Sequence, residues 1–145
     1  MTQLRALNQS LPMQLLKARE TTMTQFRPLL REHGLTEQQW RVLRVLAAQD
    51  RVDASQLAQD CVLLAPSLTR ILNTLTAEGL ISKSPDPTDQ RRTIVSLTAE
   101  GWRKYRYISP DSELTYQSIE QRFGKTKLRQ LYQLLDELNG ALTDR

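Results

Sequence analysis

The sequence contains a single cysteine, Cys61, and a single histidine, His33. One cysteine cannot form a disulfide within the chain and fits a reducing compartment. One histidine leaves no second imidazole for a histidine-rich metal site or a triad-like arrangement. The composition supplies little for catalysis, so we expect no catalytic residues, no metal and no cofactor. A small hydrolase or redox enzyme is the least favoured class of function.

Long apolar runs are also missing, and no stretch approaches the length of a membrane span. The first residues, MTQLRALNQSLPMQ, lack the basic start, apolar centre and small-residue cleavage site of a secretion signal. We therefore expect a cytoplasmic protein without membrane contact. The length of 145 residues, 39% of them hydrophobic, fits one globular domain that works as an oligomer.

Positive charge is in modest excess, with a net charge of +4. Such an excess favours a polyanionic partner. The central segment 35–101, however, carries seven basic and eight acidic side chains. A nucleic-acid function must therefore rest on where individual arginines lie rather than on bulk charge.

Helical patterns fill the first half of the chain. Apolar spacing, caps and breakers predict helices over residues 11–32, 36–50, 54–61 and 66–77. Pro28 is expected to kink or divide the first helix. Thr36 and Gln39 form a capping box for the second helix, whose expected inner face is Trp40, Leu43, Val45 or Leu46, and Ala47. The third helix is capped by Asp53 or Ser55, and the fourth has Pro66 in its first turn, Gly79 after its end, and an apolar stripe of Leu68, Ile71, Leu72 and Leu75.

The second half opens with strand patterns. Residues 80–84, LISKS, and 91–97, RRTIVSL, flank a turn containing Pro85 and Pro87, which predicts a hairpin. A helix is then expected to begin near Thr98 and to be interrupted or bent at Ser109-Pro110. Gly124 should separate it from a last helix with a stripe of leucines: Leu128, Leu131, Leu134 or Leu135, Leu138 and Leu142.

This order of elements predicts a mainly α fold with a small β-hairpin, a winged helix-turn-helix. We expect a single domain, 1–145, whose DNA-binding lobe is 35–101. The flanking segments 1–34 and 102–145 are expected to be dimerisation helices, because pairing with a second copy is the simplest way to bury their apolar faces.

The helix over 66–77 is the candidate reader of DNA bases. Residues near the N-terminus of a helix in the major groove contact base edges, and arginine can bridge guanine as asparagine can bridge adenine. The exposed polar set is Ser67, Thr69, Arg70, Asn73 and Thr74. The alternative is an ordinary solvated helix face, but the position just before the hairpin favours the reader.

Two arginines lie at the end of the hairpin. Asp89 is close enough to Arg91 to orient its guanidinium, which would leave Arg92 to meet the phosphate backbone. An arginine at the tip of a wing can also enter the minor groove. The alternative, that the arginines keep a hairpin soluble, is less favoured.

The segment DPTDQRRTIVSLTAEG matches a known signature. Its Asp89, Arg91, Leu97, Thr98 and Gly101 follow the pattern D-x-R-x-x-x-x-x-L-T-x-x-G of the MarR family. The segments HGLTEQQWRVLRVL and SLTRILNTLTAEGLI also resemble that family, and the resemblance spans about residues 11–142. It implies a homodimeric winged helix-turn-helix repressor on double-stranded DNA with a pseudo-palindromic operator. A small phenolic or aromatic carboxylate effector would release it.

Within the family, REHGLTEQQWRVLR, ISPDSE and IEQRFGKTKLRQLYQLLDEL resemble repressors of aromatic catabolism, of homoprotocatechuate or para-hydroxyphenylacetate. One departure is Gln90, where many members carry another arginine. It makes the wing tip less basic than in those members and shifts the expected phosphate contact to Arg92.

An aromatic acid needs an apolar slot with one or two cations. The resemblance places that slot between the dimer helices and the DNA-binding lobe. The lining candidates are Arg19, Trp40, Arg41 and Arg44, with Met13 and His33 behind them. As alternatives, Trp40 belongs to the core, and Arg41 and Arg44 form a solvated face or pair with Glu37 and Asp50.

Two further readings concern Cys61 and the function class. Some members of the family sense oxidants through cysteine, but Cys61 follows Asp60 and precedes an apolar run, which favours a buried small residue. The alternative function is a winged-helix protein-interaction module without sequence-specific DNA binding.

Overall fold

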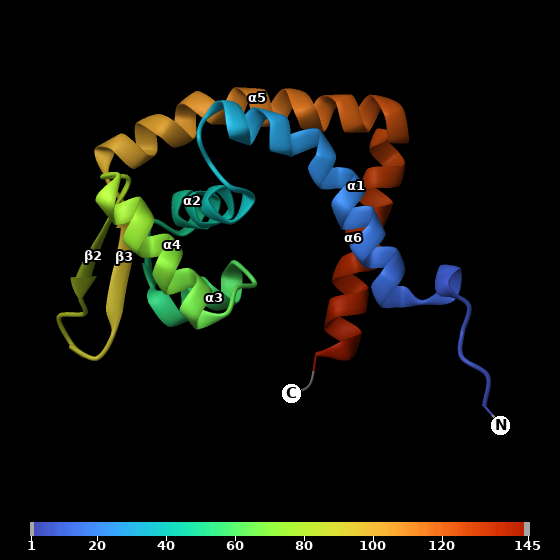
Figure 1. Ribbon diagram of the computed structural model, residues 1–145, viewed down its shortest axis with the longest axis horizontal. Helices are drawn as coiled ribbons and strands as arrows, with labels where there is room; N and C mark the ends of the chain where they lie inside the picture. Colours follow the sequence, from blue (N-terminus) through green and yellow to red (C-terminus); the bar gives the residue numbers. More distant parts are fainter. Residues whose placement is uncertain (1, 144–145) are drawn as a thin grey trace. The chain divides into compact units, whose positions relative to one another are not determined.

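The computed structural model describes residues 2–143, and these form two compact units that divide between Ser109 and Pro110. Within the described residues the elements, in chain order, are η1 (Leu7–Gln9), α1 (Leu11–Glu32), α2 (Glu37–Gln49), β1 (Arg51–Asp53), α3 (Ala54–Asp60), α4 (Ala65–Ala77), β2 (Ile81–Pro85), β3 (Thr93–Leu97), α5 (Ala99–Phe123) and α6 (Lys125–Leu142) (Figure 1). The mainly α fold with a small β-sheet is confirmed.

Helices α1 and α2 begin and end close to where the sequence predicts. Helix α1 runs through Pro28 without division, and Phe26 and Leu30 are buried along it. The capping box of α2 is confirmed: Gln39 N donates to Thr36 Oγ1 at 3.1 Å, and Thr36 N donates to Gln39 Oε1 at 3.0 Å. Its buried face is Trp40, Val42, Leu43 and Leu46, so the prediction missed Val42, while Val45 and Ala47 are half-buried.

Helices α3 and α4 form the helix-turn-helix. Of the two predicted caps for α3, Asp53 is the one used, since its Oδ1 accepts from Ser55 N at 3.1 Å. Helix α4 has Pro66 in its first turn and buries Leu68, Leu72 and Leu75. Because these leucines are three or four residues apart, they occupy one side and leave the opposite side to solvent.

The described strands form one antiparallel sheet in the order β1-β3-β2. The predicted hairpin is confirmed, with Ile81 opposite Leu97 and Pro85 opposite Thr93; β2, β3 and the turn between them, residues 81–97, form the wing. The sequence prediction missed β1, which pairs Val52 with Val95. Three residues are too few to show strand periodicity, so only the packed structure reveals this strand.

The core of the first unit lies among α2, α3, α4 and the sheet (Figure 1). Fully buried side chains come from each of these elements: Leu43, Leu46, Leu57, Leu75 and Val95. Trp40 closes one side of the core, with its ring stacked on Tyr105 of α5 at a centroid distance of 5.5 Å. The wing and α4 therefore pack against the same hydrophobic core.

Thr98 and Gly101 join the sheet to α5. Thr98 N donates to Leu80 O at 3.1 Å, and Thr98 Oγ1 donates to Gly79 O at 2.6 Å while accepting from Gly101 N at 3.1 Å. A Cβ built on Gly101 would overlap the carbonyl oxygen of Leu80. The L-T-x-x-G part of the signature thus lets α5 start directly against the backbone that follows α4.

Helix α5 continues through Pro110, so of the two predicted alternatives, an interruption or a bend, the interruption is wrong. Proline removes one backbone hydrogen bond, but the bonds on either side can keep the helix continuous. Gly124, with φ of 111°, separates α5 from α6 as predicted. Among the described residues no helix is long and apolar enough to cross a bilayer.

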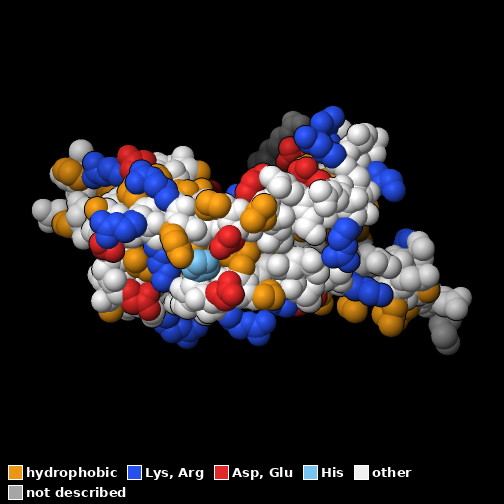
Figure 2. All heavy atoms as spheres, turned by 90° about the horizontal axis from the view of Figure 1, so that it is seen from above, with side chains coloured by type: hydrophobic (Ala, Val, Ile, Leu, Met, Phe, Trp, Pro, Cys, Tyr) orange, Lys and Arg blue, Asp and Glu red, His pale blue; other side chains and the backbone are white. Residues whose placement is uncertain are grey.

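Apolar side chains remain at the surface. In α6 none of the described residues is buried, and Leu131, Leu134 and Leu142 are exposed. In α1, Leu11, Leu15 and Leu16 are exposed. Figure 2 shows apolar side chains scattered among charged groups on one face. An isolated chain therefore leaves the predicted helical stripes uncovered.

Candidate functional site

The exposed side of α4 carries the predicted polar set. Thr69, Arg70, Asn73 and Thr74 are exposed, and Ser67 is half-buried. Thr69 Oγ1 donates to Ala65 O at 3.0 Å and Thr74 Oγ1 donates to Arg70 O at 3.2 Å. A hydroxyl has one proton to donate, so these two threonines present acceptor oxygens outward. Arg70 supplies the donors for guanine or phosphate.

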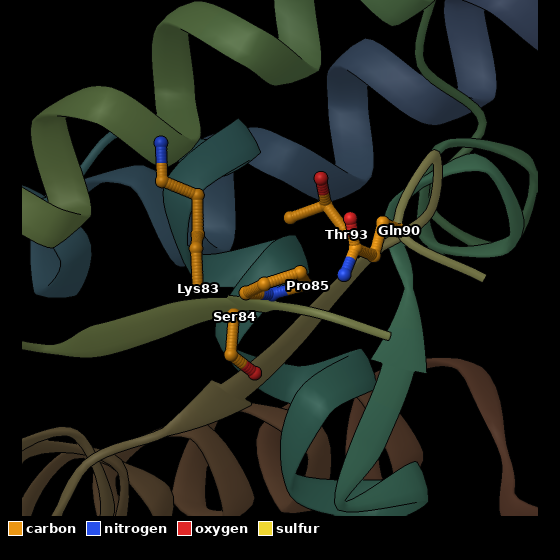
Figure 3. A pocket seen from close by; sticks show the side chains of 5 residues that line it. All are labelled: Lys83, Ser84, Pro85, Gln90 and Thr93. Atoms are coloured by element: carbon orange, nitrogen blue, oxygen red, sulfur yellow. The ribbon is translucent and has the colours of Figure 1, made fainter. Parts of the chain in front are cut away.

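Asn73 is tied to the wing by Lys83, a residue that the sequence prediction missed. Lys83 Nζ donates to Asn73 Oδ1 at 2.9 Å. Lys83 shares its face of β2 with the buried Ile81, so it points toward α4, while Ser84 points to the opposite side (Figure 3). The amide NH₂ of Asn73 stays available as a donor. The alternation in LISKS was the signal that could have placed Lys83 beside the reader helix.

A hollow of about 310 Å³ lies beside the wing turn, where β2 ends and β3 begins. It is lined by Lys83, Ser84, Pro85, Gln90 and Thr93 (Figure 3). Its lining combines one cation with small polar groups and a proline. It lacks an aromatic wall, and aromatic and apolar side chains predominate in small-molecule sites. We therefore assign it to the surface of the wing rather than to effector binding.

The wing turn is held by two carboxylates. Arg91 donates from Nε to Asp89 Oδ1 at 3.1 Å and from Nη2 to Asp89 Oδ2 at 3.3 Å, so the predicted orientation of Arg91 is confirmed. Thr88 N and Oγ1 both donate to Asp86 Oδ1 at 2.9 Å. The hydrogen bonds from Arg91 lower the pKa of Asp89, and those from Thr88 lower the pKa of Asp86. Arg91 itself extends into solvent, with 90% of its side chain exposed.

Arg92 has acidic partners, contrary to the expectation that it is left over for phosphate. Its Nη2 and Nε donate to Asp53 Oδ2 at 2.9 and 3.2 Å, and its Nε lies 4.0 Å from Asp86 Oδ2. The hydrogen bond to Asp53 is the main cause that raises the pKa of Arg92. The sequence could not show this pair because Asp53 is 39 residues away. Arg92 thus fixes the wing, and Arg91 is the more accessible cation.

Of the effector candidates, Arg19 of α1 pairs with Glu37 at the start of α2. Arg19 Nη2 lies 3.2 Å from Glu37 Oε1, and Arg27 Nη2 lies 3.8 Å from Glu37 Oε2. Glu37 Oε2 is buried without a hydrogen-bond partner among the described residues. Glu37, considered above only as an alternative partner of Arg41 and Arg44, pairs here with Arg19 and Arg27 of α1. Arg27 and Glu37 were missed as members of this cluster.

The remaining effector candidates lie in different surroundings. Trp40 is 8% exposed and stacks on Tyr105, while Arg41 Nη1 donates to Cys61 O at 2.9 Å. His33 ends α1 and meets the ring of Tyr107 edge-on at 5.4 Å. Arg44 and Met13 are exposed, on α2 and α1. Arg41 is therefore directed to the turn before α4, which makes it a support of the reader helix.

Cys61 lies in the core, as predicted. Its side chain is fully buried, and burial raises the pKa of the thiol to about 11, with a smaller contribution from Asp60 and an opposing one from Arg41. A protonated buried thiol is a poor nucleophile. This geometry favours a packing role for Cys61.

Comparison with known proteins gives consistent matches. Residues 33–92 match the model of the MarR family. The homoprotocatechuate degradative operon repressor of Escherichia coli is 41% identical over 131 residues, which cover 90% of this chain and 88% of that protein. The HTH-type transcriptional regulator FarR of Neisseria gonorrhoeae is 42% identical over 124 residues, covering 86% and 85%.

Solved structures agree with the sequence matches. The transcriptional regulator PA4135 superimposes with a TM-score of 0.89 at 45% identity, covering 93% of this chain and 98% of that chain. NadR in complex with 4-hydroxyphenylacetate superimposes with a TM-score of 0.82 at 40% identity, covering 95% and 96%. These proteins share the fold over nearly the full chain.

Proposed function

The chain belongs to the MarR family of transcriptional regulators, and from that premise we propose a homodimeric repressor of an aromatic-acid catabolic operon. The observation that carries the proposal is the arrangement of α4 beside the wing. Arg70 and Asn73 face outward on α4, Lys83 joins α4 to β2, and Asp89 holds Arg91 out in solvent. The outward groups of α4 suit base edges, and the exposed guanidinium of Arg91 suits phosphates.

In this proposal α4 enters the major groove. Arg70 and Asn73 read bases, and Ser67, Thr69 and Thr74 contact bases or phosphates around them. Arg91 reaches the backbone or the minor groove, while Asp89 orients it and Arg92 holds the wing through Asp53. Because Arg91 is nearly fully exposed, it can approach DNA without breaking contacts in the core.

The functional unit is proposed to be a dimer on a pseudo-palindromic operator. The exposed leucines of α1 and α6 support this, since large apolar side chains on helices are usually covered in the assembled protein. Two reader helices about one DNA turn apart can enter successive major grooves. Such a regulator works at the chromosome, so we place it in the cytoplasm, with no enzymatic role.

The proposed effector is a phenolic or aromatic carboxylate, homoprotocatechuate or 4-hydroxyphenylacetate. The names of the E. coli relative and of the NadR complex support this class. The candidate site in this chain is the region of Arg19 and Glu37, with Trp40, Arg41, Arg44, Met13 and His33 as further lining. A ligand carboxylate can compete with Glu37 for Arg19, which gives the ligand a direct effect on how α1 holds α2.

Release of DNA requires that the effector binds the DNA-incompatible arrangement more tightly. A hundredfold loss of operator affinity corresponds to about 2.7 kcal/mol of coupling. A charge-assisted contact with one arginine and burial of an aromatic ring can supply this amount.

Fluorescence anisotropy on DNA from upstream of the protein's own gene and its neighbours tests the proposal. We expect tight, salt-dependent binding that homoprotocatechuate or 4-hydroxyphenylacetate weakens, and that Arg70→Ala reduces. Phenylacetate, which lacks only the phenolic hydroxyl of 4-hydroxyphenylacetate, is the matched ligand control. Tight binding indifferent to both phenolic acids would reject the effector class alone. Absence of binding to every fragment would reject the regulator and favour a protein-interaction module.

A further inference from the structure

The turn between α3 and α4 contains an unusual residue, Val62. Its φ is 55°, in the left-handed region. This conformation is uncommon for any residue with a side chain and is a clear outlier for a β-branched one. Its side chain is 83% exposed, so it contributes little packing to its own fold.

The backbone bonding explains the conformation of Val62 but not the choice of valine. Val62 N donates to Gln59 O at 3.1 Å, and Leu63 N donates to Ala58 O at 2.9 Å. These two bonds form the Schellman motif that ends α3. In such motifs the position that Val62 occupies here is usually glycine. Glycine would adopt this φ without steric cost.

The turn is fixed from both sides. Cys61 is fully buried, Leu63 packs against the core, and Arg41 Nη1 donates to Cys61 O at 2.9 Å. Because its neighbours point inward, Val62 is held outward. Leu64, the N-cap of α4, is also directed to solvent, with 77% exposure. Two large apolar side chains, Val62 and Leu64, are thus exposed to solvent just before the reader helix begins.

We propose that Val62 and Leu64 are specificity-determining residues that contact thymine 5-methyl groups in the operator. The inference rests on the proposed function, in which the N-terminal end of α4 enters the major groove. The thymine methyl is the apolar group that bases present in that groove. Neither side chain can form a hydrogen bond with a phosphate or a base edge. The sequence also has valine at a backbone conformation that glycine would adopt without strain. Strained residues of this kind tend to lie at functional sites.

The test removes the methyl groups from the DNA and the side chains from the protein. Single thymines of the operator are replaced by deoxyuridine, which lacks only the methyl group. Affinities are measured by anisotropy for the full-length wild type, Val62→Gly and Leu64→Ala. Leu4→Ala is the matched control, since Leu4 is an exposed leucine outside the helix-turn-helix.

We expect deoxyuridine at one position of a half-site to weaken the wild type about fourfold, the equivalent of one buried methyl group, and about 16-fold when both half-sites are changed. Val62→Gly or Leu64→Ala should bind thymine and deoxyuridine DNA equally at that position, while Leu4→Ala should discriminate like the wild type. Val62→Gly should also unfold at an equal or higher temperature, because glycine relieves the strained φ. A merely structural valine would instead lose stability.

Two results would overturn the inference. Wild type that binds tightly but treats thymine and deoxyuridine alike at every position would reject the methyl contact and leave the proposed regulator intact. Discrimination that persists in both variants would assign the methyl contact to other residues. Failure of the wild type to bind any DNA would reject the proposed function itself, together with this inference.

Discussion

Arg92 and Asp53 are joined by two hydrogen bonds to one carboxylate oxygen, at 2.9 and 3.2 Å. The other oxygen of Asp53 accepts from Ser55 N at 3.1 Å and caps α3. Asp53 also ends β1, which pairs with β3 of the wing. One carboxylate thus links the wing to the first helix of the helix-turn-helix.

Replacing Asp53 with asparagine separates these two roles. Asparagine is as good a cap as aspartate but has no charge to hold Arg92. We expect Asp53→Asn to weaken operator binding several-fold in anisotropy while thermal unfolding changes little. Asp53→Ala should lose about 1 kcal/mol more of unfolding free energy, because the cap is lost as well. Unchanged operator affinity in Asp53→Asn would exclude a role of the ion pair in positioning the wing.

Arg91→Ala should weaken binding to all DNA sequences by a similar factor. A phosphate contact carries no sequence information, and each one lost reduces the slope of log affinity against log salt by about one. Because a dimer has two wings, the magnitude of the slope of log affinity against log salt should fall by about two in a salt titration. The matched control is Arg103→Ala, since Arg103 is likewise exposed and paired with an acid, Glu100, but lies on α5. A loss confined to the operator sequence would instead indicate base reading by Arg91.

Gly101→Ala should destabilise the protein, because the new Cβ would overlap the carbonyl oxygen of Leu80. Overpacking of this kind costs about 1–3 kcal/mol, measured by urea unfolding. Gly140→Ala is the control, since a Cβ there meets no described atom within 4 Å and alanine favours a helix. It should leave the free energy of unfolding unchanged or raise it by up to about 1 kcal/mol. Equal effects of the two changes would refute the close approach of α5 to Leu80.

Cys61 predicts a specific loss of stability at alkaline pH. Its thiol has an ordinary pKa of 9.0, and burial raises the pKa to about 11 in the folded chain. A raised pKa gives stability that is complete below pH 9 and is lost as the pH rises toward 11. From pH 7.5 to pH 10 the wild type should lose about 1 kcal/mol more than Cys61→Ala. Parallel urea unfolding of both proteins measures the difference, and identical losses would argue against a raised thiol pKa.

The elements of the fold could largely be predicted because they depend on near neighbours in the chain. The capping box of Thr36 and Gln39 spans three residues, and the leucine stripe of α4 repeats every three or four. The contact of Asp89 with Arg91 also lies within one turn. Helix α5 is the exception. Proline is a strong local breaker, and Pro110 is nevertheless accommodated in the helix.

The sequence by itself determined the helices, the hairpin, the family signature and the polar face of α4, since periodicity, caps and turns are encoded locally. Only the tertiary structure decided which charged groups meet. It paired Arg92 with Asp53, Lys83 with Asn73, and Arg19 with Glu37, at separations that no local pattern specifies. Side chains far apart in the chain meet only after the core has packed, so their partners depend on the packing of whole elements.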